Sequence, residues 1–345
     1  MVTSHEVARL AGVSQPTVSR ALRDSAKVSE ETKRRVREAA AALGYVPSAM
    51  GRALSVGRSG RVGLLLTDLH NQFYPHVIAS MHDALEDLGY QLVLITESSE
   101  AGPIADRIAS SGLDGVLLTT TTLDSILPIR LRDRQIPFVY FNRTSSSVEA
   151  DSVTVDPSQG IDAMIKTLVD FGHRDVAAIF GPRNTSTGES RETCTREALD
   201  TAGISIPQRW TQHGPFDFET GHIGARELLQ ASDRPTVILC GNDVVALGAL
   251  NAAAELGIEV PGEVSIVGFD DLPTSSWALI QLTTVAFDLD AMSHEAARLL
   301  VQRVERRSDT AYVHAVYPTE LRLRRTLGRP APLPSATSQP LIAAP

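Results

Sequence analysis

Short, continuous apolar runs separated by longer amphipathic stretches dominate the chain after residue 60. A strand that is apolar at every position has to be covered on both faces, which is typical of a parallel sheet with helices on either side. The runs fall in a set of four and a set of three: residues 61–68, 90–96, 114–120 and 136–142, then 175–181, 236–241 and 263–269. We therefore predict an α/β core of two lobes, each a doubly wound parallel sheet.

Amphipathic stretches between these runs are long enough to be crossover helices. They occupy residues 75–89, 189–202, 219–231 and 244–256. In doubly wound sheets, small molecules bind beyond the carboxyl ends of the strands, and in a two-lobed core this places them between the lobes. The core is therefore expected to hold a ligand in an interlobe cleft.

Charge is divided unevenly along the chain. The net charge is −9, yet residues 1–61 hold 11 Lys and Arg against 5 Asp and Glu, a net of +6, and the remainder carries −15. A small basic segment on an acidic body indicates an anionic partner for that segment alone. A solvated, charged helix would give the same balance, so charge by itself leaves both interpretations open.

Pro16 lies inside the helix-like stretch 11–22. Proline breaks helix interiors, but the first-turn N–H groups of a helix have no partner within the helix. Pro16 therefore marks a helix start, as its first or second residue, and Ser14 is expected to cap that helix through its side chain. Ser4 is expected to cap a preceding helix, and Gly12 permits the turn between the two.

A third helix is predicted to start at Ser29 and to stop at Gly44. Two short helices joined by a tight turn and braced by a third form a helix-turn-helix, whose second helix enters the DNA major groove and reads bases with its N-terminal residues. A generic three-helix bundle is the alternative. The turn, the polar tip of the second helix and the basic balance together favour DNA binding.

These residues resemble the headpiece of LacI-type (LacI/GalR) bacterial transcription regulators. The similarity begins with "VARLAGVSQPTVSRAL", runs through "VSEETKRRVREAAAALGYVPS" and "RALSVGRSGRVGLLL", and returns in "IPFVYFNR", "GHRDVAAIFGP" and "CGNDVVALGALNAAAELGIEVPGEVSIVGFDD". It covers residues 3–326 in the right order. The resemblance implies a helix-turn-helix headpiece and a core like that of periplasmic sugar-binding proteins, with the chain crossing between the lobes near 157–160, 285–289 and 318–320.

On the DNA side, the resemblance assigns contacts to six residues of the headpiece. The positions that contact base edges are Gln15, Pro16 and Arg20, and those that contact phosphates are Ser14, Thr17 and Ser19. Arginine pairs well with guanine and glutamine with adenine, whereas phosphate contacts fix the register without reading sequence.

The resemblance also divides the chain into four parts. They are a headpiece over residues 1–46, a hinge helix and linker over 47–60, an effector-binding and dimerisation core over 61–327, and a tail over 328–345. In the family the hinge helix pushes a leucine into the minor groove, and Leu54 holds that position. Gly51 stands where alanine is usual, so we predict a hinge that is less helical without DNA than is typical. The proline-rich tail is expected to be disordered, because it lacks the leucine heptads of a tetramerising coiled coil.

On the ligand side, the resemblance implies a cleft for a polyhydroxylated molecule. Its candidate residues are Phe73, Tyr74, Arg191, Phe216, Asn242 and Asp270. Aromatic faces suit sugar rings, and fixed polar groups suit hydroxyls. Strand-end capping and interlobe ion pairing are the alternative roles, and Asp156 fits either. Asn142, Cys194 and Phe287 depart from the family pattern, so sugars, glycosides and nucleosides all remain open as effectors.

Together these features predict a transcription regulator of the repressor type. It would bind a palindromic operator as a homodimer and respond to a small-molecule effector, without a cofactor. The dimer surface is expected to include the helices near 75–88, 219–231 and 244–256. A solute-binding protein and a sugar-processing enzyme are the competing classes.

Enzyme and metal interpretations find little support in the sequence. The loop 181–190 resembles a phosphate-binding loop, but Glu189 stands where that motif requires lysine. We find no G-x-S-x-G elbow and no metal-type histidine spacing. Cys194 and Cys240 are predicted to be reduced packing residues. The absence of a signal segment and of a membrane-length apolar run predicts a cytoplasmic protein.

Overall fold

The computed structural model describes residues 2–22, 24–45, 58–67, 71–96, 104–306 and 311–330. The chain divides into two compact units, Met1–Gly60 and Arg61–Pro345. Leu54, with the predicted hinge helix, and the tail beyond residue 330 lie outside the described residues.

The first unit is a bundle of three helices: α1 (Ser4–Ala11), α2 (Gln15–Leu22) and α3 (Glu30–Ala42). Each helix turns small apolar side chains inward, and Val7, Val18 and Val36 meet there with almost no exposed surface. Helices of this length are marginal on their own in water, so mutual burial stabilises the bundle. The arrangement is the predicted helix-turn-helix.

Two helix starts differ slightly from the sequence prediction. The capping residue of α1 is Thr3 and not Ser4, because Glu6 reaches back and accepts a hydrogen bond from the Thr3 N–H at 2.7 Å. Ser29 precedes α3 rather than starting it, since its Oγ accepts from the Thr32 N–H at 3.3 Å and so caps the helix.

The second unit contains, in its described part, two six-stranded sheets. The first sheet has the order β11-β5-β4-β3-β1-β2, and its pairings are parallel. Its strands are β1 (Arg61–Leu66), β2 (Gln91–Thr96), β3 (Gly115–Leu118), β4 (Phe138–Phe141), β5 (Ser152–Val155) and β11 (His314–Tyr317). Its helices are α5 (Phe73–Asp87), α6 (Ile104–Ser110), α7 (Leu127–Asp133) and α12 (Leu289–Arg306). We call this part the N-lobe.

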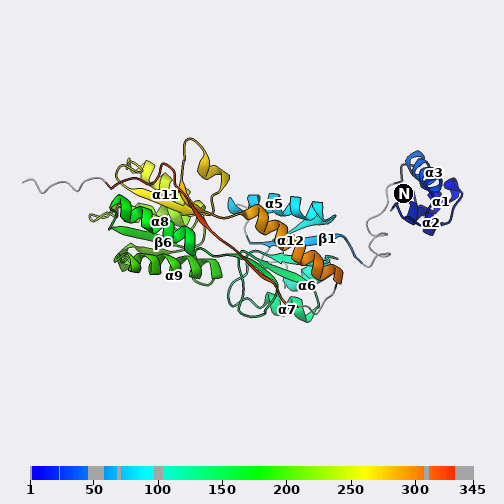
Figure 1. Cartoon of the computed structure of the whole chain (residues 1–345), viewed down its shortest axis with the longest axis horizontal. Coiled ribbons are helices and arrows are strands. Elements are labelled where there is room, and N and C mark those ends of the chain that lie inside the picture. Colours follow the sequence, from blue (N-terminus) through cyan, green and yellow to red (C-terminus); the bar gives the residue numbers. More distant parts are fainter. Residues whose placement is uncertain are drawn as a thin grey trace, which may run out of the picture. The chain divides into compact units, whose positions relative to one another are not determined.

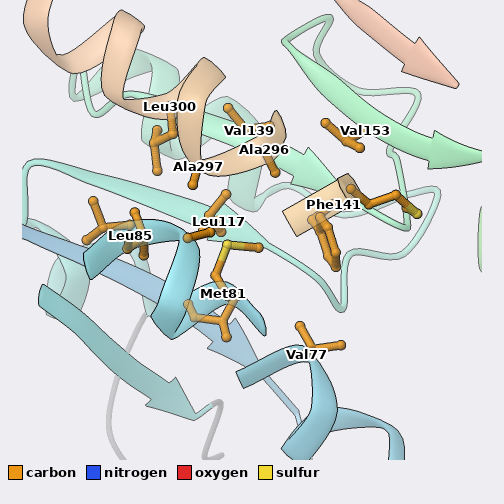
Figure 2. Close-up of a cluster of buried hydrophobic side chains, with 14 of the residues drawn as sticks. Val77, Met81, Leu85, Leu117, Val139, Phe141, Val153, Ala296, Ala297 and Leu300 are labelled. Carbon is orange, nitrogen blue, oxygen red and sulfur yellow. The ribbon is translucent and has the colours of Figure 1, made fainter. Parts of the chain in front are cut away.

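Successive residues of β1 pack into opposite layers of the N-lobe. Leu64 packs in the layer of α5 and α12, whereas Leu65 packs in that of α6 and α7. Figure 2 shows the first layer, in which Met81 of α5 and Leu300 of α12 lie near Leu117 of β3. Burial on both faces is the physical reason for the continuous apolar runs in the sequence.

The second sheet, with its helices, forms the C-lobe (Figure 1). Its order is β12-β10-β9-β8-β6-β7, and only β12 pairs antiparallel among these strands. Its strands are β6 (Val176–Phe180), β7 (Thr211–His213), β8 (Val237–Cys240), β9 (Ser265–Phe269), β10 (Thr283–Ala286) and β12 (Glu320–Arg322). Its α-helices are α8 (Ser158–Phe171), α9 (Ser186–Thr201), α10 (Phe218–Gln230) and α11 (Asp243–Glu255), and its 3-10 helices are η1 (Gln208–Trp210) and η2 (Pro273–Ser276). No helix in the described residues is long and apolar enough to cross a membrane.

The helices α10 and α11 are in backbone contact at two glycines. A Cβ on Gly221 would lie 1.9 Å from the Val245 carbonyl oxygen, and one on Gly248 would lie 2.1 Å from the Phe218 carbonyl oxygen. Larger residues at either position would push the helices apart. The pair therefore acts as one rigid layer on this face of the C-lobe.

Three short segments connect the lobes. They are the connections from Val155 to Ser158, from Ala286 to Leu289 and from Tyr317 to Glu320. The last two agree with the sequence prediction. The first prediction, 157–160, lies two residues late, because the Asp156 carboxylate accepts from the Ser158 N–H at 3.0 Å and so starts α8 immediately after the crossing.

Candidate functional sites: an exposed helix and an interlobe cleft

The helix α2 buries one face and leaves the other accessible. Val18 and Ala21 are buried, and Pro16 is the second residue of the helix, as predicted. Ser14, Pro16 and Arg20 are exposed, and Gln15, Thr17 and Ser19 are partly exposed. The six headpiece residues predicted to contact DNA thus lie on one accessible stretch that runs from the residue before α2 to its last turn.

Local hydrogen bonds order the tip of α2. The N–H groups of Thr17 and Val18 donate to the backbone carbonyl of Ser14, at 2.9 and 3.1 Å, and not to its side chain as the sequence predicted. The Ser14 hydroxyl lies instead 2.8 Å from the Thr17 hydroxyl, because the two side chains meet over the first turn. Gln15 Nε2 donates to Ser4 Oγ at 3.3 Å, which ties the tip to α1.

The basic residues of the headpiece differ in how they are paired. Lys33, Arg34 and Arg37 of α3 each make an ion pair with a nearby carboxylate. Arg20 makes no ion pair with the residues that the structure describes. Its charge is therefore available to an anionic or electronegative partner in front of α2.

A buried ion pair lies at the carboxyl ends of the C-lobe strands. Arg191 of α9 donates through Nη2 to Asp270 Oδ1 at 2.8 Å and through Nη1 to the Gly241 carbonyl at 2.8 Å. The two side chains are 8% and 3% exposed. Burial raises the pKa of the Asp270 carboxyl, and the positive charge of Arg191 opposes that rise. The pair thus satisfies two charges that would be costly alone.

Phe216 packs its ring against the ends of two strands. A Cβ on Gly181 would lie 2.1 Å from this ring, and one on Gly241 would lie 3.0 Å from it. Two guanidinium groups also lie near the ring, with the Cζ of Arg191 at 5.5 Å and that of Arg143 at 5.6 Å from its centre. Gly181 therefore makes room for an aromatic ring, and not for a phosphate.

Asn242 has a structural partner as well as a place beside the ion pair. Its Oδ1 accepts from the Val245 N–H at 2.9 Å and caps α11. Its side chain also acts against the rise in the pKa of the Asp270 carboxyl. The capping role that the sequence left open is therefore present, beside the Arg191–Asp270 pair.

Phe73 and Tyr74 begin α5 on the N-lobe side. Both are buried in the N-lobe core, with their rings edge to face at 5.8 Å. Tyr74 also interacts electrostatically with Arg143. Tyr74 therefore lies close to the groups around Phe216, whereas Phe73 mainly fills the core.

Several buried polar groups between the lobes were not among the predicted ligand residues, although Asn142 was noted as a departure from the family pattern. Three buried oxygens have no hydrogen-bond partner in the part of the chain that the structure describes: Thr121 Oγ1, Asn142 Oδ1 and Thr187 Oγ1. Thr121 and Asn142 follow β3 and β4, and Thr187 lies in the first turn of α9. A buried polar atom without a partner costs free energy unless a ligand or water satisfies it. The sequence signal for these residues was their position directly after an apolar run or at a helix start.

Hydrogen bonds join the two lobes across this site. The pairs are Asn71 Nδ2 to the Phe216 carbonyl at 2.6 Å, the Leu123 N–H to the Asn184 carbonyl at 2.9 Å, and the Thr144 N–H to Ser186 Oγ at 3.0 Å. The two lobes are therefore held together by direct hydrogen bonds beside the Arg191–Asp270 pair. Arg143 and Thr144 bring the end of β4 against the start of α9.

Comparison with known proteins identifies the family of the chain. Residues 3–48 match the model described as "Bacterial regulatory proteins, lacI family", and residues 165–327 match the "Periplasmic binding protein-like domain". The HTH-type transcriptional repressor PurR of Pectobacterium carotovorum subsp. carotovorum is 31% identical over 335 residues, which are 96% of this chain and 98% of that protein. The chain belongs to the lacI family of bacterial regulatory proteins.

Solved structures share the whole lacI-family architecture. The transcriptional regulator CelR in complex with cellobiose is 31% identical, with a TM-score of 0.70, over 94% of this chain and 100% of that one. The lac repressor dimer bound to operator and the anti-inducer ONPF is 25% identical, with a TM-score of 0.81, over 94% of this chain and 98% of that one. This lacI-family chain is a DNA-binding transcriptional regulator and not an enzyme, as the sequence predicted.

Two residues that depart from the lacI-family pattern lie outside the centre of the cleft. Cys194 lines a groove of about 540 Å³ between α8 and α9. The ring of Phe287 lies 6.3 Å from that of Phe269, whose face carries Arg191 at 3.7 Å. Within the described ranges, no group of three or more His, Cys, Asp or Glu side chains is placed to hold a metal ion.

Asp243 connects the cleft of this lacI-family chain to the loop after β9. Its carboxylate accepts from the Leu272 N–H at 2.8 Å, from Ser275 Oγ at 2.6 Å and from Thr284 Oγ1 at 2.5 Å. Burial, with a smaller contribution from the charge of Asp270, raises the pKa of Asp243 to about 7. The folded state therefore holds this proton more tightly than the unfolded state does.

This raised pKa predicts a pH dependence with a defined sign. Its contribution to stability is complete below the unfolded pKa of about 4 and is lost as pH rises through about 7. Between pH 5 and pH 8, the wild type should lose on the order of 1–3 kcal/mol of unfolding free energy relative to Asp243→Asn, which cannot ionise. Urea titrations of both proteins at the two pH values measure this difference. Equal losses in the two proteins would contradict the assignment.

Proposed function

We propose that this chain is a transcriptional repressor that binds a palindromic operator as a homodimer and is controlled by a small polyhydroxylated effector between its lobes. The accessible side of α2, with Gln15, Pro16 and Arg20 opposite a buried helix face, carries the DNA-binding part. Regulation by a small molecule is supported by the unpartnered buried oxygens in the cleft of the same chain.

The chemistry of the cleft supports an effector with several hydroxyl groups. Phe216 offers an aromatic face, and Thr121, Asn142 and Thr187 offer unused hydrogen-bonding atoms. The CelR structure contains cellobiose, and the lac repressor structure contains ONPF. A sugar, a glycoside or a nucleoside would fit this chemistry.

A homodimer is supported by an apolar groove of about 790 Å³ that spans both lobes. Its apolar and aromatic lining includes Phe218, Leu247, Leu250, Trp277, Leu279 and Ile280, and the N-lobe contributes Gln72, which precedes α5, and Pro75 and His76 of α5. Leu279 and Trp277 are 101% and 60% exposed. Exposed apolar surface of this extent favours burial against a second copy, and two headpieces would then read two half-sites.

In the proposed mechanism, the effector acts by changing the relative stability of two lobe arrangements. The interlobe hydrogen bonds of Asn71 and Thr144 belong to the closed arrangement. An effector that satisfies the cleft oxygens favours closure, which shifts the N-lobes of the dimer and changes operator affinity. Such coupling is typically 1–3 kcal/mol.

Selection of binding sites from a random duplex pool tests this function. At near-physiological salt, nonspecific phosphate binding is weak, so enrichment reports specific recognition. We expect the full chain to enrich a palindrome with two half-sites. Enrichment of a single asymmetric site would contradict the dimer, and no enrichment with or without pooled sugars and nucleosides would contradict the function.

The dimer predicts a strong effect of a charge in the apolar groove. Leu279→Asp should convert the dimer into a monomer, because a carboxylate would be buried without a partner at the interface. Light scattering measures the molar mass, and operator titration should show a loss of affinity for the two-half-site operator. Ile126→Asp is the matched control, since Ile126 is 56% exposed and lies outside the groove. A Leu279→Asp dimer would refute this surface.

A further inference from the structure

We propose that Ser4 is a positioning residue for base recognition, because its hydroxyl holds the Gln15 amide in place before DNA binds. This inference rests on the proposed function and specifies how the headpiece reads one base of each half-site. Gln15 Nε2 donates to Ser4 Oγ at 3.3 Å, and both residues are only partly exposed. Neither side chain makes another hydrogen bond with the residues that the structure describes.

Gln15 carries the polar groups that can read a base edge at the start of α2. The next position, Pro16, has an apolar ring and offers no side-chain donor or acceptor. In the major groove an adenine presents N7 as an acceptor and N6 as a donor, and a glutamine amide matches both. Because Nε2 carries two hydrogens, the bond to Ser4 leaves the second hydrogen and Oε1 for the adenine. The contact with Ser4 is therefore compatible with base reading.

The bond to Ser4 acts on the freedom of the Gln15 side chain. Glutamine is among the side chains with the most rotamer freedom, and fixing such a side chain at an interface weakens binding. The bond to Ser4 restricts this freedom in the free headpiece, so less of it is lost when the operator binds. A fixed amide also cannot turn to suit another base, which increases the difference in affinity between the right and the wrong base.

The local fold holds Ser4 firmly enough for this role. Ser4 is the first residue of α1, and Thr3 and Glu6 close the start of that helix through their capping box. Gly12 then adopts a left-handed conformation, with a φ of 63°, and so permits the tight turn toward α2. This turn brings Ser4 and Gln15, which are eleven positions apart, within hydrogen-bond distance.

The test measures operator affinity of full-length wild type, Ser4→Ala, Ser4→Thr and Gln15→Ala by fluorescence titration. Each protein is titrated with the selected palindrome and with variants in which one base pair of one half-site is replaced. Gln15→Ala identifies the base pair that Gln15 reads, because the preference at that position disappears. Ser4→Ala should reduce the preference at the same position by about 5-fold, the contribution of one neutral hydrogen bond. Ser4→Thr keeps the hydroxyl and should retain the preference.

Thr3→Ala is the matched control for the stability of α1. It removes the Thr3 hydroxyl from the capping box but leaves the bond between Ser4 and Gln15 intact. We expect it to lower the stability of the headpiece and to leave the base preference unchanged. Ser4→Ala should fold at least as well as wild type, because alanine is the better helix former.

A double variant separates positioning from a direct contact. Ser4→Ala combined with Gln15→Ala should match Gln15→Ala alone, because Ser4 acts through Gln15. A further loss of base preference in the double variant would show that Ser4 itself contacts a base, which contradicts the inference.

The remaining outcomes separate this inference from the proposed function. The inference fails if Ser4→Ala keeps the wild-type preference, if Ser4→Thr or Thr3→Ala loses as much preference as Ser4→Ala, or if Ser4→Ala weakens all sequences equally, as loss of a phosphate contact would. It also fails if Gln15→Ala alters no base preference, although a palindrome bound by the wild type would still support the proposed function. A wild type that prefers no palindrome contradicts the proposed function and this inference with it.

Discussion

Replacement of Arg20 by alanine is expected to lower operator affinity by roughly 30-fold or more and to relax the base preference at one position of each half-site. Arg20 is exposed on α2 and makes no ion pair with described residues. A bidentate contact between arginine and guanine contributes about 1–3 kcal/mol of discrimination, and a homodimer carries two such contacts. Fluorescence titration of labelled operators, including single-base variants, measures both quantities.

Arg34→Ala provides a matched control for this prediction. It removes the same charge from the same headpiece, but Arg34 lies on α3 and pairs with Glu38 at 3.1 Å. This variant should leave the base preference intact and change affinity only slightly. If Arg20→Ala instead weakens all sequences to the same extent, Arg20 contacts phosphate, and its assignment to a base edge is wrong.

Replacement of Asp270 by asparagine is expected to lower the free energy of unfolding by about 3 kcal/mol. The change leaves the Arg191 guanidinium buried without a carboxylate, and breaking a buried pair costs about 3–5 kcal/mol. We expect the lower end of this range, because the amide oxygen of the introduced asparagine still accepts a hydrogen bond from Arg191. Asparagine also tolerates the positive φ of 118° at this position, so the backbone is not the cause of the loss. Denaturant unfolding of the full chain measures the change.

A double variant distinguishes charge from packing at this pair. Arg191→Met together with Asp270→Asn removes the unpaired charge, and methionine still packs against the Phe216 and Phe269 rings that flank Arg191. We expect the double variant to recover at least half of the stability lost by Asp270→Asn, and to lose the effector response because both charged groups of the pair are gone. An additive further loss would show that the Arg191 side chain stabilises the lobe mainly through its other contacts.

The sequence predicted the layered fold well where burial was complete. The runs at 61–68 and 136–142 became β1 and β4, and the three apolar runs of the C-lobe became β6, β8 and β9. It gave no strand for β5, β7, β10, β11 or β12, because these strands are short and several lie at sheet edges or have mixed burial. It also missed α12, which contributes to the N-lobe core although it follows the C-lobe strands.

The candidate site likewise contains residues that the sequence predicted and residues that it missed. Arg191, Phe216, Asn242 and Asp270 were chosen from strand ends and a family resemblance, and the structure brings them into one cluster. Thr121 and Thr187 were overlooked, because it is their buried hydroxyls without a partner in the described chain that single them out. The sequence alone does not show which polar side chains find a partner after folding.

By itself, the sequence determined the layer order and the helix-turn-helix, since hydrophobic period, capping residues and proline position act over a few neighbouring residues. Only the tertiary structure decided which polar groups meet between the lobes. The contact between Arg191 and Asp270 spans 79 positions, and the one between Asn71 and Phe216 spans 145. Such contacts depend on how the three connecting segments bring the two sheets together. A local sequence pattern does not predict which residues so far apart in the chain will meet.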